Sequence, residues 1–375
     1  MTSSPGFLIS AGGTGGGIYP ALAVAEAIHK HDPSIRLRYI GSQGMERGLI
    51  ARSAAPDLFW SYDDVQSGPL NGVSMRRRVT SVFKIGIGTL QSLRLVRRYR
   101  PAALLITGGW ATFPVAVACR VLGVPVTIYL PDIEPGVTIK GLSRLAKVIY
   151  ATSGQSQSYF PKAPGKVVET GYPLRAQVLD ATRVAGIAHF RLDPVRRTLL
   201  VFGGSRGARS LNLALVAILP ALLADGLQVI HIAGEADWND AQVRRAALSV
   251  EERARYQAFP YLHEDMGLAL AVADLTVSRA GASALGEFPQ FGIAAILVPY
   301  PFAWRYQSIN ADWLAERGAA IRLNDEELAD KLLSTIQSLL IDSARLEAMR
   351  HQSAALAKPD GAMVIAQNLI ALAHR

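Results

Sequence analysis

Two glycine-rich segments of the chain have the residue types of loops that bind phosphate groups. They are residues 12–17 and 203–208, and each follows a short apolar run and precedes an amphipathic segment. Glycines allow the backbone to turn sharply and to approach a ligand closely, and the helix that follows points unpaired N–H groups at an anion. In the second segment, Ser205 adds a hydroxyl that suits a phosphate. One such segment is a weak signal, but two of them predict twin Rossmann-like domains.

A third small-residue segment, residues 278–287, lies in the same half of the chain as the second glycine loop. It ends an apolar run and opens a predicted helix, so that Ala282 and Ser283 fall in a first turn that could face a phosphate. Glu287 lies one to two turns into that helix, where a carboxylate could accept hydrogen bonds from both hydroxyls of a ribose. Taken alone, the segment is more typical of a tight turn between a strand and a helix. Together with residues 203–208 it favours nucleotide binding.

Both halves of the chain alternate strand and helix signals, which is typical of a parallel sheet covered by helices. In the first half we expect strands at 6–11, 37–40, 102–106, 124–130 and 148–152, with helices at 19–29 and 114–121. After a break near 171–175, we expect strands at 198–202, 227–233, 273–277, 294–299 and 319–323, with helices at 211–224, 282–288 and 307–316.

The predicted fold class is therefore α/β, with two Rossmann-like domains whose parallel sheets face an interdomain cleft. We expect the first domain at residues 1–172 and the second at 173–351. A last amphipathic helix at 363–374 is expected to pack back on the first domain, within a C-terminal segment of residues 352–375.

The composition fits a globular protein of two domains, either soluble or peripheral to a membrane. At 375 residues the chain is too long for one ordinary core, and 50% of its residues are hydrophobic while 18% are charged. The single Cys119 excludes an internal disulfide and fits a reducing compartment. We expect neither a signal peptide nor an apolar run of the ~20 residues that span a bilayer. The net charge of +9 favours anionic partners such as nucleotides, diphosphates, nucleic acid or acidic lipid.

The motifs, taken in order along the chain, resemble those of the MurG-type N-acetylglucosaminyltransferases of peptidoglycan synthesis, which are family 28 glycosyltransferases. Besides the segments above, the likeness rests on 171–175 (Gly-Tyr-Pro-Leu-Arg) and 307–311 (Gln-Ser-Ile-Asn-Ala), and it covers nearly the whole chain. The resemblance implies a GT-B fold and an inverting transfer that uses neither a metal nor a cofactor. The donor would be UDP-N-acetylglucosamine, and the acceptor would be a muramoyl pentapeptide linked to undecaprenyl diphosphate.

The resemblance also implies where the protein acts and which residues bind substrate. It implies a peripheral protein on the cytoplasmic face of a bacterial plasma membrane, with an anionic membrane surface as a partner and no nucleic acid. Arg175 matches an arginine that contacts the donor, and His263 falls where the family holds uracil through a backbone amide. The complete implied set of substrate-binding residues is Thr14, Gly15, Gly16, Asp132, Arg175, Ser205, His263, Ala282, Ser283, Glu287 and Gln307, and no residue is assigned to a metal.

Departures from the family pattern gather on the acceptor side. Gly17 stands where the family's first loop ends in a histidine, a proposed catalytic group, and Asp132 stands in place of an asparagine. A hydroxyl that attacks an anomeric carbon needs a proton acceptor within ~3 Å, which a glycine does not supply. Asp132 and Glu134 are the candidate catalytic bases, because they follow a strand of the first half, where an open α/β sheet places its ligand crevice. The alternative for both is a loop carboxylate that caps the next helix.

A basic and apolar segment lies in the first half, between the predicted strands. Its cations surround an apolar group, which suits an anionic membrane, and the matching region of the family docks on the membrane. The alternative is a core helix that buries its apolar side and solvates its basic side. The cations are Arg76, Arg77, Arg78, Lys84, Arg94, Arg97, Arg98 and Arg100, and the apolar residues are Val79, Val82, Phe83, Ile85 and Ile87.

Three other functions are open on the sequence alone. A related glycosyltransferase with another lipid or small-molecule acceptor fits the altered acceptor-side motifs, and a non-catalytic UDP-sugar-binding protein fits the loss of the histidine. A NAD-dependent dehydrogenase is disfavoured, because the first loop lacks the Gly-x-Gly-x-x-Gly spacing. The strand at 37–40 also ends in Gly41 and Ser42, with no acidic residue for the adenosine ribose.

Overall fold

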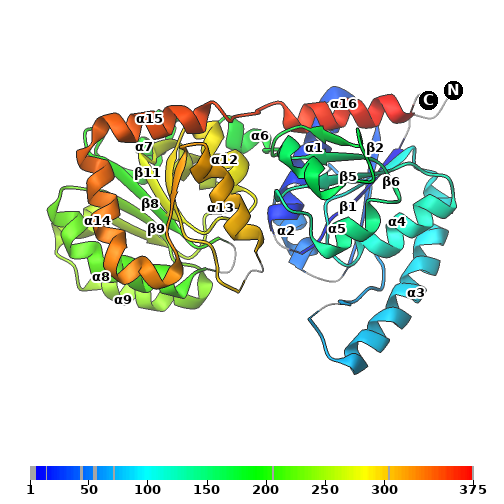
Figure 1. Cartoon of the computed structure of the whole chain (residues 1–375), viewed down its shortest axis with the longest axis horizontal. Helices are drawn as coiled ribbons and strands as arrows, with labels where there is room; N and C mark the ends of the chain where they lie inside the picture. The colour runs from blue at the N-terminus through cyan, green and yellow to red at the C-terminus, as the bar shows by residue number, and fades with distance from the viewer. Residues whose placement is uncertain are drawn as a thin grey trace. The chain divides into compact units, whose positions relative to one another are not determined.

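The chain forms two compact units in the computed structural model, which describes residues 6–13, 15–42, 45–53, 57–70, 72–204, 207–302 and 305–373 (Figure 1). The first unit comprises Met1–Ala176 and Pro359–Arg375, and the second comprises Gln177–Lys358. The chain therefore crosses between the units at residues 176 and 358, where the sequence suggests 172 and 351. Tyr172 and Arg175 still pack on the first unit, and α15 (Ser343–Ala354) carries the second unit past residue 351.

A seven-stranded parallel sheet forms the centre of the first unit, in the order β3-β2-β1-β4-β5-β6-β7. Its middle strands are short apolar runs, buried on both faces because helices cover both sides of the sheet. The strands are β1 (Gly6–Ser10), β2 (Arg36–Gly41), β3 (Ser61–Asp64), β4 (Ala103–Ile106), β5 (Val126–Leu130), β6 (Ala146–Ala151) and β7 (Val167–Glu169).

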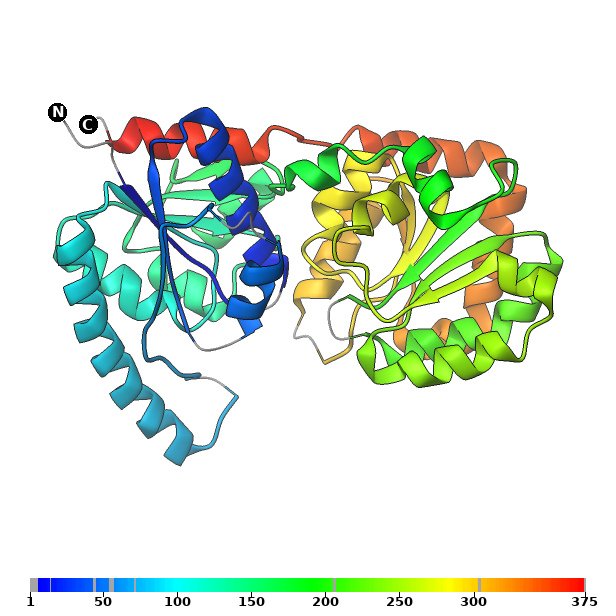
Figure 2. The ribbon, with the colours of Figure 1, turned by 180° about the vertical axis from the view of Figure 1, so that it is seen from behind.

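Helices cover the two faces of this sheet. On one face the core joins Leu8, Leu104 and Ile106 to α4, α5 and Val96 of α3. On the other face α1 and α16 lie side by side, as Figure 1 and Figure 2 both show. The helices are α1 (Gly15–His31), α2 (Met45–Ser53), α3 (Met75–Tyr99), α4 (Thr112–Val121), α5 (Val137–Leu142) and α16 (Gly361–Ala373), with the 3-10 helix η1 (Gly154–Tyr159).

The second unit repeats this plan with a six-stranded parallel sheet in the order β10-β9-β8-β11-β12-β13. Its core on one face joins β8, β11 and β12 to α8, α14 and α15. The strands are β8 (Thr198–Phe202), β9 (Gln228–Ile232), β10 (Tyr256–Phe259), β11 (Leu275–Ser278), β12 (Ala294–Leu297) and β13 (Ala320–Arg322). The helices are α6 (Ala176–Leu179), α7 (Arg183–Phe190), α8 (Arg209–Ala224), α9 (Trp238–Ala246), α10 (Val250–Arg255), α11 (Met266–Val272), α12 (Ala284–Phe291), α13 (Tyr306–Glu316), α14 (Leu328–Ile341) and α15, with the 3-10 helices η2 (Glu235–Asp237) and η3 (Asp325–Glu327).

The strand order reverses once in each sheet, between β1 and β4 and between β8 and β11. Ser10 pairs with Ile106 and Ser278 pairs with Phe202, so the two central strands of each sheet end level with one another. The loops that follow them therefore leave the carboxyl edge side by side. This is the position where open α/β sheets bind ligands, and both glycine loops of the sequence lie there.

The basic and apolar segment of the sequence forms α3, and the large apolar residues of its amino-terminal half face outward. Phe83, Val82 and Val79 are 70%, 57% and 50% exposed, whereas the small Ser81 and Gly88 are buried. A Cβ on Gly88 would lie 1.9 Å from the carbonyl oxygen of Gln66, so the helix approaches this backbone through a glycine. The alternative of a core helix with a buried apolar side is therefore wrong for this half of α3.

In both ribbon views, the amino-terminal half of α3 extends away from the sheet of its unit (Figure 1 and Figure 2). Within the described ranges, the chain has no helix that is long and apolar enough to cross a membrane.

Candidate functional site

The glycine loop after β8 folds back tightly before α8 begins. The N–H of Gly207 donates to the carbonyl oxygen of Gly204 at 3.0 Å, and the φ angles of Gly204 and Gly207 are 80° and 72°. A Cβ on Gly203 would lie 2.3 Å from the amide nitrogen of Ala208, so only glycine fits there. This turn brings the unpaired N–H groups of the first turn of α8 to the carboxyl edge of the sheet. Ser205, predicted as a phosphate ligand, lies outside the described residues.

Two buried side chains hold the loop after β11. Arg279, which is 7% exposed, donates to the carbonyl oxygen of Val298 at 3.1 Å and to Ser210 Oγ at 2.8 Å. Asn310 of α13 is fully buried and donates from Nδ2 to the carbonyl oxygen of Ala280 at 3.2 Å. These bonds tie the loop to the end of β12, to α8 and to α13.

Ala282, Ser283 and Glu287 lie where this loop enters α12. Ala282 is buried, while Ser283 and Glu287 are half-buried. The N–H of Glu287 donates to the carbonyl oxygen of Ser283 at 2.8 Å, which closes the first turn of the helix. The Glu287 carboxylate therefore belongs to the first turn of a helix that starts from the carboxyl edge of the sheet.

Gln307 and His263 come from two further connections that follow strands of this sheet. Gln307 Oε1 accepts a hydrogen bond from the N–H of Tyr300 at 2.8 Å, which assigns the amide nitrogen Nε2 to donate to other groups. His263 is exposed between β10 and α11, with its ring centroid 4.5 Å from that of Tyr261. Because the strands are parallel, the connections after β8, β10, β11 and β12 all leave one edge of the sheet.

In the first unit, the loops after β1 and β4 pack closely against each other at two glycines. A Cβ on Gly109 would lie 2.7 Å from the Cα atom of Gly12, so the loop after β4 does not tolerate a side chain at this contact. The carbonyl oxygen of Gly16 accepts from the Tyr172 hydroxyl at 3.1 Å, which joins residues 171–175 to the start of α1. Gly15 is buried in the same turn, and Thr14 lies outside the described residues.

Arg175 is held against α1 at the point where the chain leaves the first unit. Its guanidinium carbon lies 4.4 Å from the ring centroid of Tyr19, and the residue is 7% exposed. Glu26 of the same helix accepts from the N–H of Ala176 at 3.3 Å. Burial raises the pKa of Glu26, and the Ala176 N–H and the charge of Arg175 act in the opposite direction. Stacking and charge together hold Arg175 in place.

Position 17, where a histidine is expected from the resemblance, offers little room for a side chain. A Cβ there would lie 3.3 Å from the carbonyl oxygen of Gly12 and 3.4 Å from Thr107 Oγ1. Thr107 is 3% exposed, and its hydroxyl has no hydrogen-bond partner among the described residues. Gly17 therefore suits the close packing of the first loop on the end of β4.

The two candidate bases on the loop after β5 have different surroundings. Glu134 is 2% exposed and accepts from Lys140 Nζ at 3.0 Å, so its charge is already paired. Asp132 is half-buried, and hydroxyl groups hold the backbone on both sides of it: Thr152 donates to the carbonyl of Pro131 at 2.7 Å, and Ser156 donates to that of Ile133 at 2.8 Å. The loop therefore fixes the backbone of Asp132, while the buried carboxylate of Glu134 is paired with the exposed Lys140.

The structure places the described candidate residues at the carboxyl edges of the two sheets. Arg279 and Asn310, which shape the loop after β11, were not expected, although both lie inside motifs that the sequence shows. Their signal is a polar residue at a buried position next to a glycine-containing turn. Within the described ranges, no group of three or more His, Cys, Asp or Glu side chains is arranged to hold a metal ion.

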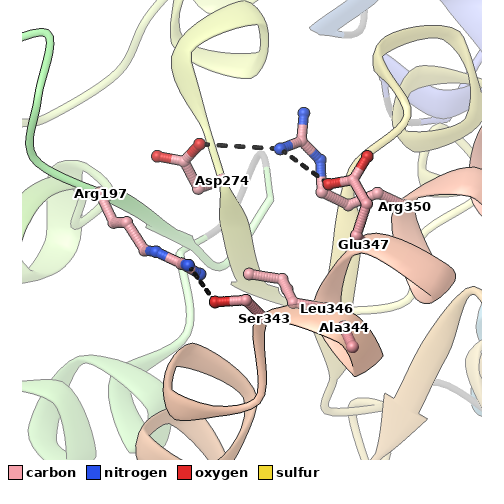
Figure 3. A pocket seen from close by; sticks show the side chains of 7 residues that line it. All are labelled: Arg197, Asp274, Ser343, Ala344, Leu346, Glu347 and Arg350. Carbon is pink, nitrogen blue, oxygen red and sulfur yellow. Dashed lines mark hydrogen bonds and ion pairs between the residues drawn. The ribbon is translucent and has the colours of Figure 1, made fainter.

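The cavity drawn in Figure 3, of about 520 Å³, lies at the opposite, amino edge of the second sheet. Its polar side chains contact one another: Arg197 donates to Ser343 Oγ at 2.7 Å, and Arg350 lies 3.9 Å from Asp274 and 3.8 Å from Glu347. Asp274 also accepts from the backbone N–H of Thr198 at 2.7 Å, which ties the loop before β11 to the start of β8. This cavity is a structural junction and not part of the candidate site.

Comparison with known proteins agrees with this architecture. The models of the glycosyltransferase family 28 N-terminal domain and C-terminal domain match residues 7–151 and 198–365. A UDP-N-acetylglucosamine--N-acetylmuramyl-(pentapeptide) pyrophosphoryl-undecaprenol N-acetylglucosamine transferase of Roseiflexus sp. (strain RS-1) is 36% identical, over 95% of this chain and 92% of that protein. The protein of the same name from Desulforudis audaxviator is 36% identical, over 94% of each chain. Among solved structures, MurG of Acinetobacter baumannii has a TM-score of 0.72 and 26% identity, over 97% of this chain and 99% of that one.

Proposed function

Because the chain belongs to glycosyltransferase family 28, we propose that it transfers N-acetylglucosamine from UDP-N-acetylglucosamine to the muramoyl pentapeptide on undecaprenyl diphosphate. One observation carries the proposal beyond family membership. The predicted donor residues of the second unit all lie on connections that follow parallel strands of one sheet, so they share one edge of that sheet. Both ends of such a donor can therefore be held from a single surface.

Each part of the donor has a chemical counterpart on that surface. The N–H groups of the loop after β8 and of the first turn of α8 receive the diphosphate, with the Ser205 hydroxyl as an additional donor. The Glu287 carboxylate accepts from the two ribose hydroxyls, and Gln307 donates through Nε2 to an oxygen of the sugar. The loop that carries His263 holds uracil through its backbone. Arg175, which the resemblance also assigns to the donor, belongs to the first unit.

The transfer itself needs a base, and Asp132 is the residue that we assign. An acceptor hydroxyl attacks the anomeric carbon as the bond from that carbon to the diphosphate oxygen breaks, with inversion, and the hydroxyl proton passes to the Asp132 carboxylate. The fixed backbone around Asp132 supports this role, and the ion pair of Glu134 with Lys140 argues against Glu134. The charge on the departing UDP is stabilised by the N–H groups at α8, without a metal ion.

The lipid-linked acceptor places the reaction at a membrane, and α3 supplies a surface for it. Its outward apolar side chains, Val82, Phe83 and Leu90 among them, lie on the same helix as the cations of residues 76–78. Apolar side chains that enter the lipid interface and cations that meet anionic headgroups bind cooperatively to such a membrane. We propose that α3 docks the protein on the cytoplasmic face of the plasma membrane.

A second candidate function is a related transferase with a different lipid or small-molecule acceptor. Gly17 favours it. The close packing around position 17 suits a glycine, so the first loop lacks the histidine side chain that the family pattern has there. Asp132, in place of an asparagine, is a second difference on the same side. Both functions share the donor and the membrane surface, and they differ in the acceptor.

A UDP-release assay over donors and acceptors tests the proposal. With UDP-N-acetylglucosamine as donor, release of UDP should require a muramoyl-pentapeptide lipid diphosphate, and simple glycolipids should give only background hydrolysis. Release with simple glycolipids alone would replace the proposal by the second candidate. Binding of UDP without release in the presence of any acceptor would favour a non-catalytic UDP-sugar-binding protein.

A further inference from the structure

A chain of buried polar side chains runs beside the glycine loop of the second unit. Tyr256 of β10, His231 of β9 and Asn212 of α8 are 0%, 1% and 5% exposed. His231 Nδ1 lies 2.8 Å from the Tyr256 hydroxyl, and His231 Nε2 lies 3.0 Å from Asn212 Oδ1. Asn212 Nδ2 donates to the carbonyl oxygen of Ala233 and to Asp237 Oδ2, both at 2.8 Å. None of these side chains has a part in the proposed contacts with the donor.

The acceptors around Asn212 fix the direction of every hydrogen bond in this chain. Because the amide nitrogen of Asn212 faces two acceptors, its oxygen is the atom that faces His231. The Nε2 atom of His231 therefore carries the proton and donates, Nδ1 accepts, and the Tyr256 hydroxyl donates to it. Burial lowers the pKa of His231 to about 4 and outweighs the opposing charge of Asp237, so the ring is neutral at neutral pH.

The Asn212 end of this chain touches the glycine loop and the start of α8. The carbonyl oxygen of Ala233, which accepts from Asn212, is also the atom against which Gly207 packs: a Cβ there would lie 3.0 Å from it. Asp237, the second acceptor of Asn212, also accepts from Nη1 of Arg209 at 2.6 Å. Arg209 is the first residue of α8. Asn212 therefore holds the end of the glycine loop and the first turn of the helix against the same turn of chain after β9.

We propose that His231 is a positioning residue for donor binding: with Tyr256 it orients the Asn212 amide, and Asn212 holds Gly207 and the first turn of α8 in the position that receives the donor diphosphate. The inference rests on the proposed function. An Asn212 amide turned by 180° would place its oxygen against two other acceptors, the carbonyl oxygen of Ala233 and the Asp237 carboxylate. The Nε2–H of His231 favours the observed orientation, in which the amide oxygen accepts from it. A helix start that is already held in place loses less conformational freedom on binding, so it binds the diphosphate more tightly.

The test compares UDP affinity and steady-state kinetics between the wild-type chain and three variants. His231→Phe keeps a ring and removes both nitrogens, while Tyr256→Phe removes one hydroxyl. Gln228→Met is the matched control on the same strand, β9. Gln228 is 3% exposed, accepts from the N–H of Asp193 at 3.0 Å and donates to its carbonyl oxygen at 2.9 Å, at the amino end of the strand. All three variants remove buried hydrogen bonds, so a loss of stability is common to them.

We expect His231→Phe to raise the Kd for UDP and the KM for UDP-N-acetylglucosamine roughly tenfold, and Tyr256→Phe roughly threefold. Gln228→Met should leave both the Kd and the KM within about twofold of the wild-type values. The effect should appear in KM more than in kcat, because the polar chain touches no reacting atom. Ring ¹⁵N shifts of the wild-type protein should report the Nε2–H tautomer of His231.

If His231→Phe does not fold, Tyr256→Phe tests the positioning role, because it removes only one hydroxyl group. Wild-type UDP affinity in folded Tyr256→Phe, or an equal loss of affinity in Gln228→Met, would overturn the positioning role and leave the proposed function standing. A wild-type chain that binds no UDP would overturn the proposed function and this inference with it.

Discussion

The outward apolar side of α3 allows the strength of membrane binding to be predicted. In the double variant Val82→Ser/Phe83→Ser, two neighbouring side chains that are 57% and 70% exposed become polar. Full burial of such a side chain contributes about 1.5–3 kcal/mol, and the exposed share of each contributes roughly 1–2 kcal/mol on entering the membrane. The double variant should therefore bind vesicles at least about thirtyfold more weakly. Its fold should be retained, because substitutions of exposed residues change stability by about 0.5 kcal/mol or less.

Salt separates this apolar contribution from that of the cations on the same helix. Replacing Arg76, Arg77 and Arg78 by glutamine should remove ~1 kcal/mol for each cation near an anionic surface at low salt. Raising the ionic strength to 1 M shortens the screening length to ~3 Å, so the arginine variant and the parent should then bind alike. The weaker vesicle binding of Val82→Ser/Phe83→Ser should persist at this ionic strength, because the transfer of apolar side chains into the membrane does not depend on screening.

Co-sedimentation with anionic and with zwitterionic vesicles measures both effects. The matched control is Val195→Ser/Ile341→Ser, which alters two apolar residues of the second unit that are 88% and 84% exposed. The control should bind like the parent. Equal binding of the α3 variant and the parent at low salt would refute the docking role of α3, and an equal loss in the control would show that the effect is not local.

Three other substitutions give further tests. Glu287→Gln should weaken UDP binding about tenfold or more by calorimetry, because a neutral amide accepts from the ribose hydroxyls less well, and unchanged affinity would remove Glu287 from the site. Asp132→Asn should lower turnover by roughly 10²–10⁴-fold with little change in UDP affinity, and turnover within a few-fold of the parent would reject the base assignment. The pKa of about 4 for buried His231 lies below its ordinary value of 6.5, so the folded chain binds fewer protons than the unfolded chain between these values and loses stability as the pH falls. Urea unfolding at pH 7 and at pH 5 measures the change. Between these two pH values, the free energy of unfolding should fall by about 2 kcal/mol more in the wild type than in His231→Phe. An equal fall in both proteins would contradict the buried neutral ring.

The central strands of both sheets could be predicted from the sequence, because a buried parallel strand is a short apolar run that ends in a glycine turn. The strand β8 has the predicted bounds, 198–202, and β1 differs from its prediction only by the residue at its end. Of the four edge strands, only β13 was predicted, and β3, β7 and β10 were not. The strand β3 has the sequence Ser-Tyr-Asp-Asp and is half-buried throughout, so it shows neither an apolar run nor an alternation.

The helix α3 shows a limit of amphipathic patterns. Its apolar and basic residues were recognised as one surface, but the pattern alone is equally typical of a helix that buries its apolar side. The orientation depends on a contact between distant residues, since Gly88 lets the helix approach the backbone at Gln66. A sequence read locally does not contain that contact.

The candidate site was predictable in its location and only in part in its composition. Because parallel strands end at one edge of their sheet, residues near 203, 263, 283 and 307 share that edge, and those near 203 and 283 flank the point where the strand order reverses. The chain of His231, Tyr256 and Asn212 was missed because its members lie on three elements and look like isolated polar residues in apolar runs. Burial and mutual distance reveal it, and both are properties of the folded chain.

Transfer of labelled sugar into lipid is the most direct test of the proposed function. UDP-N-acetylglucosamine labelled in the sugar is incubated with the protein and with undecaprenyl-diphosphate muramoyl pentapeptide in anionic vesicles, and the lipid phase is then extracted and its mass measured. The predicted result is one added N-acetylglucosamine on the muramoyl lipid, with an equal amount of UDP released and no requirement for a divalent metal. Label that stays in the aqueous phase, or that enters only simple glycolipids, would contradict the proposed transfer.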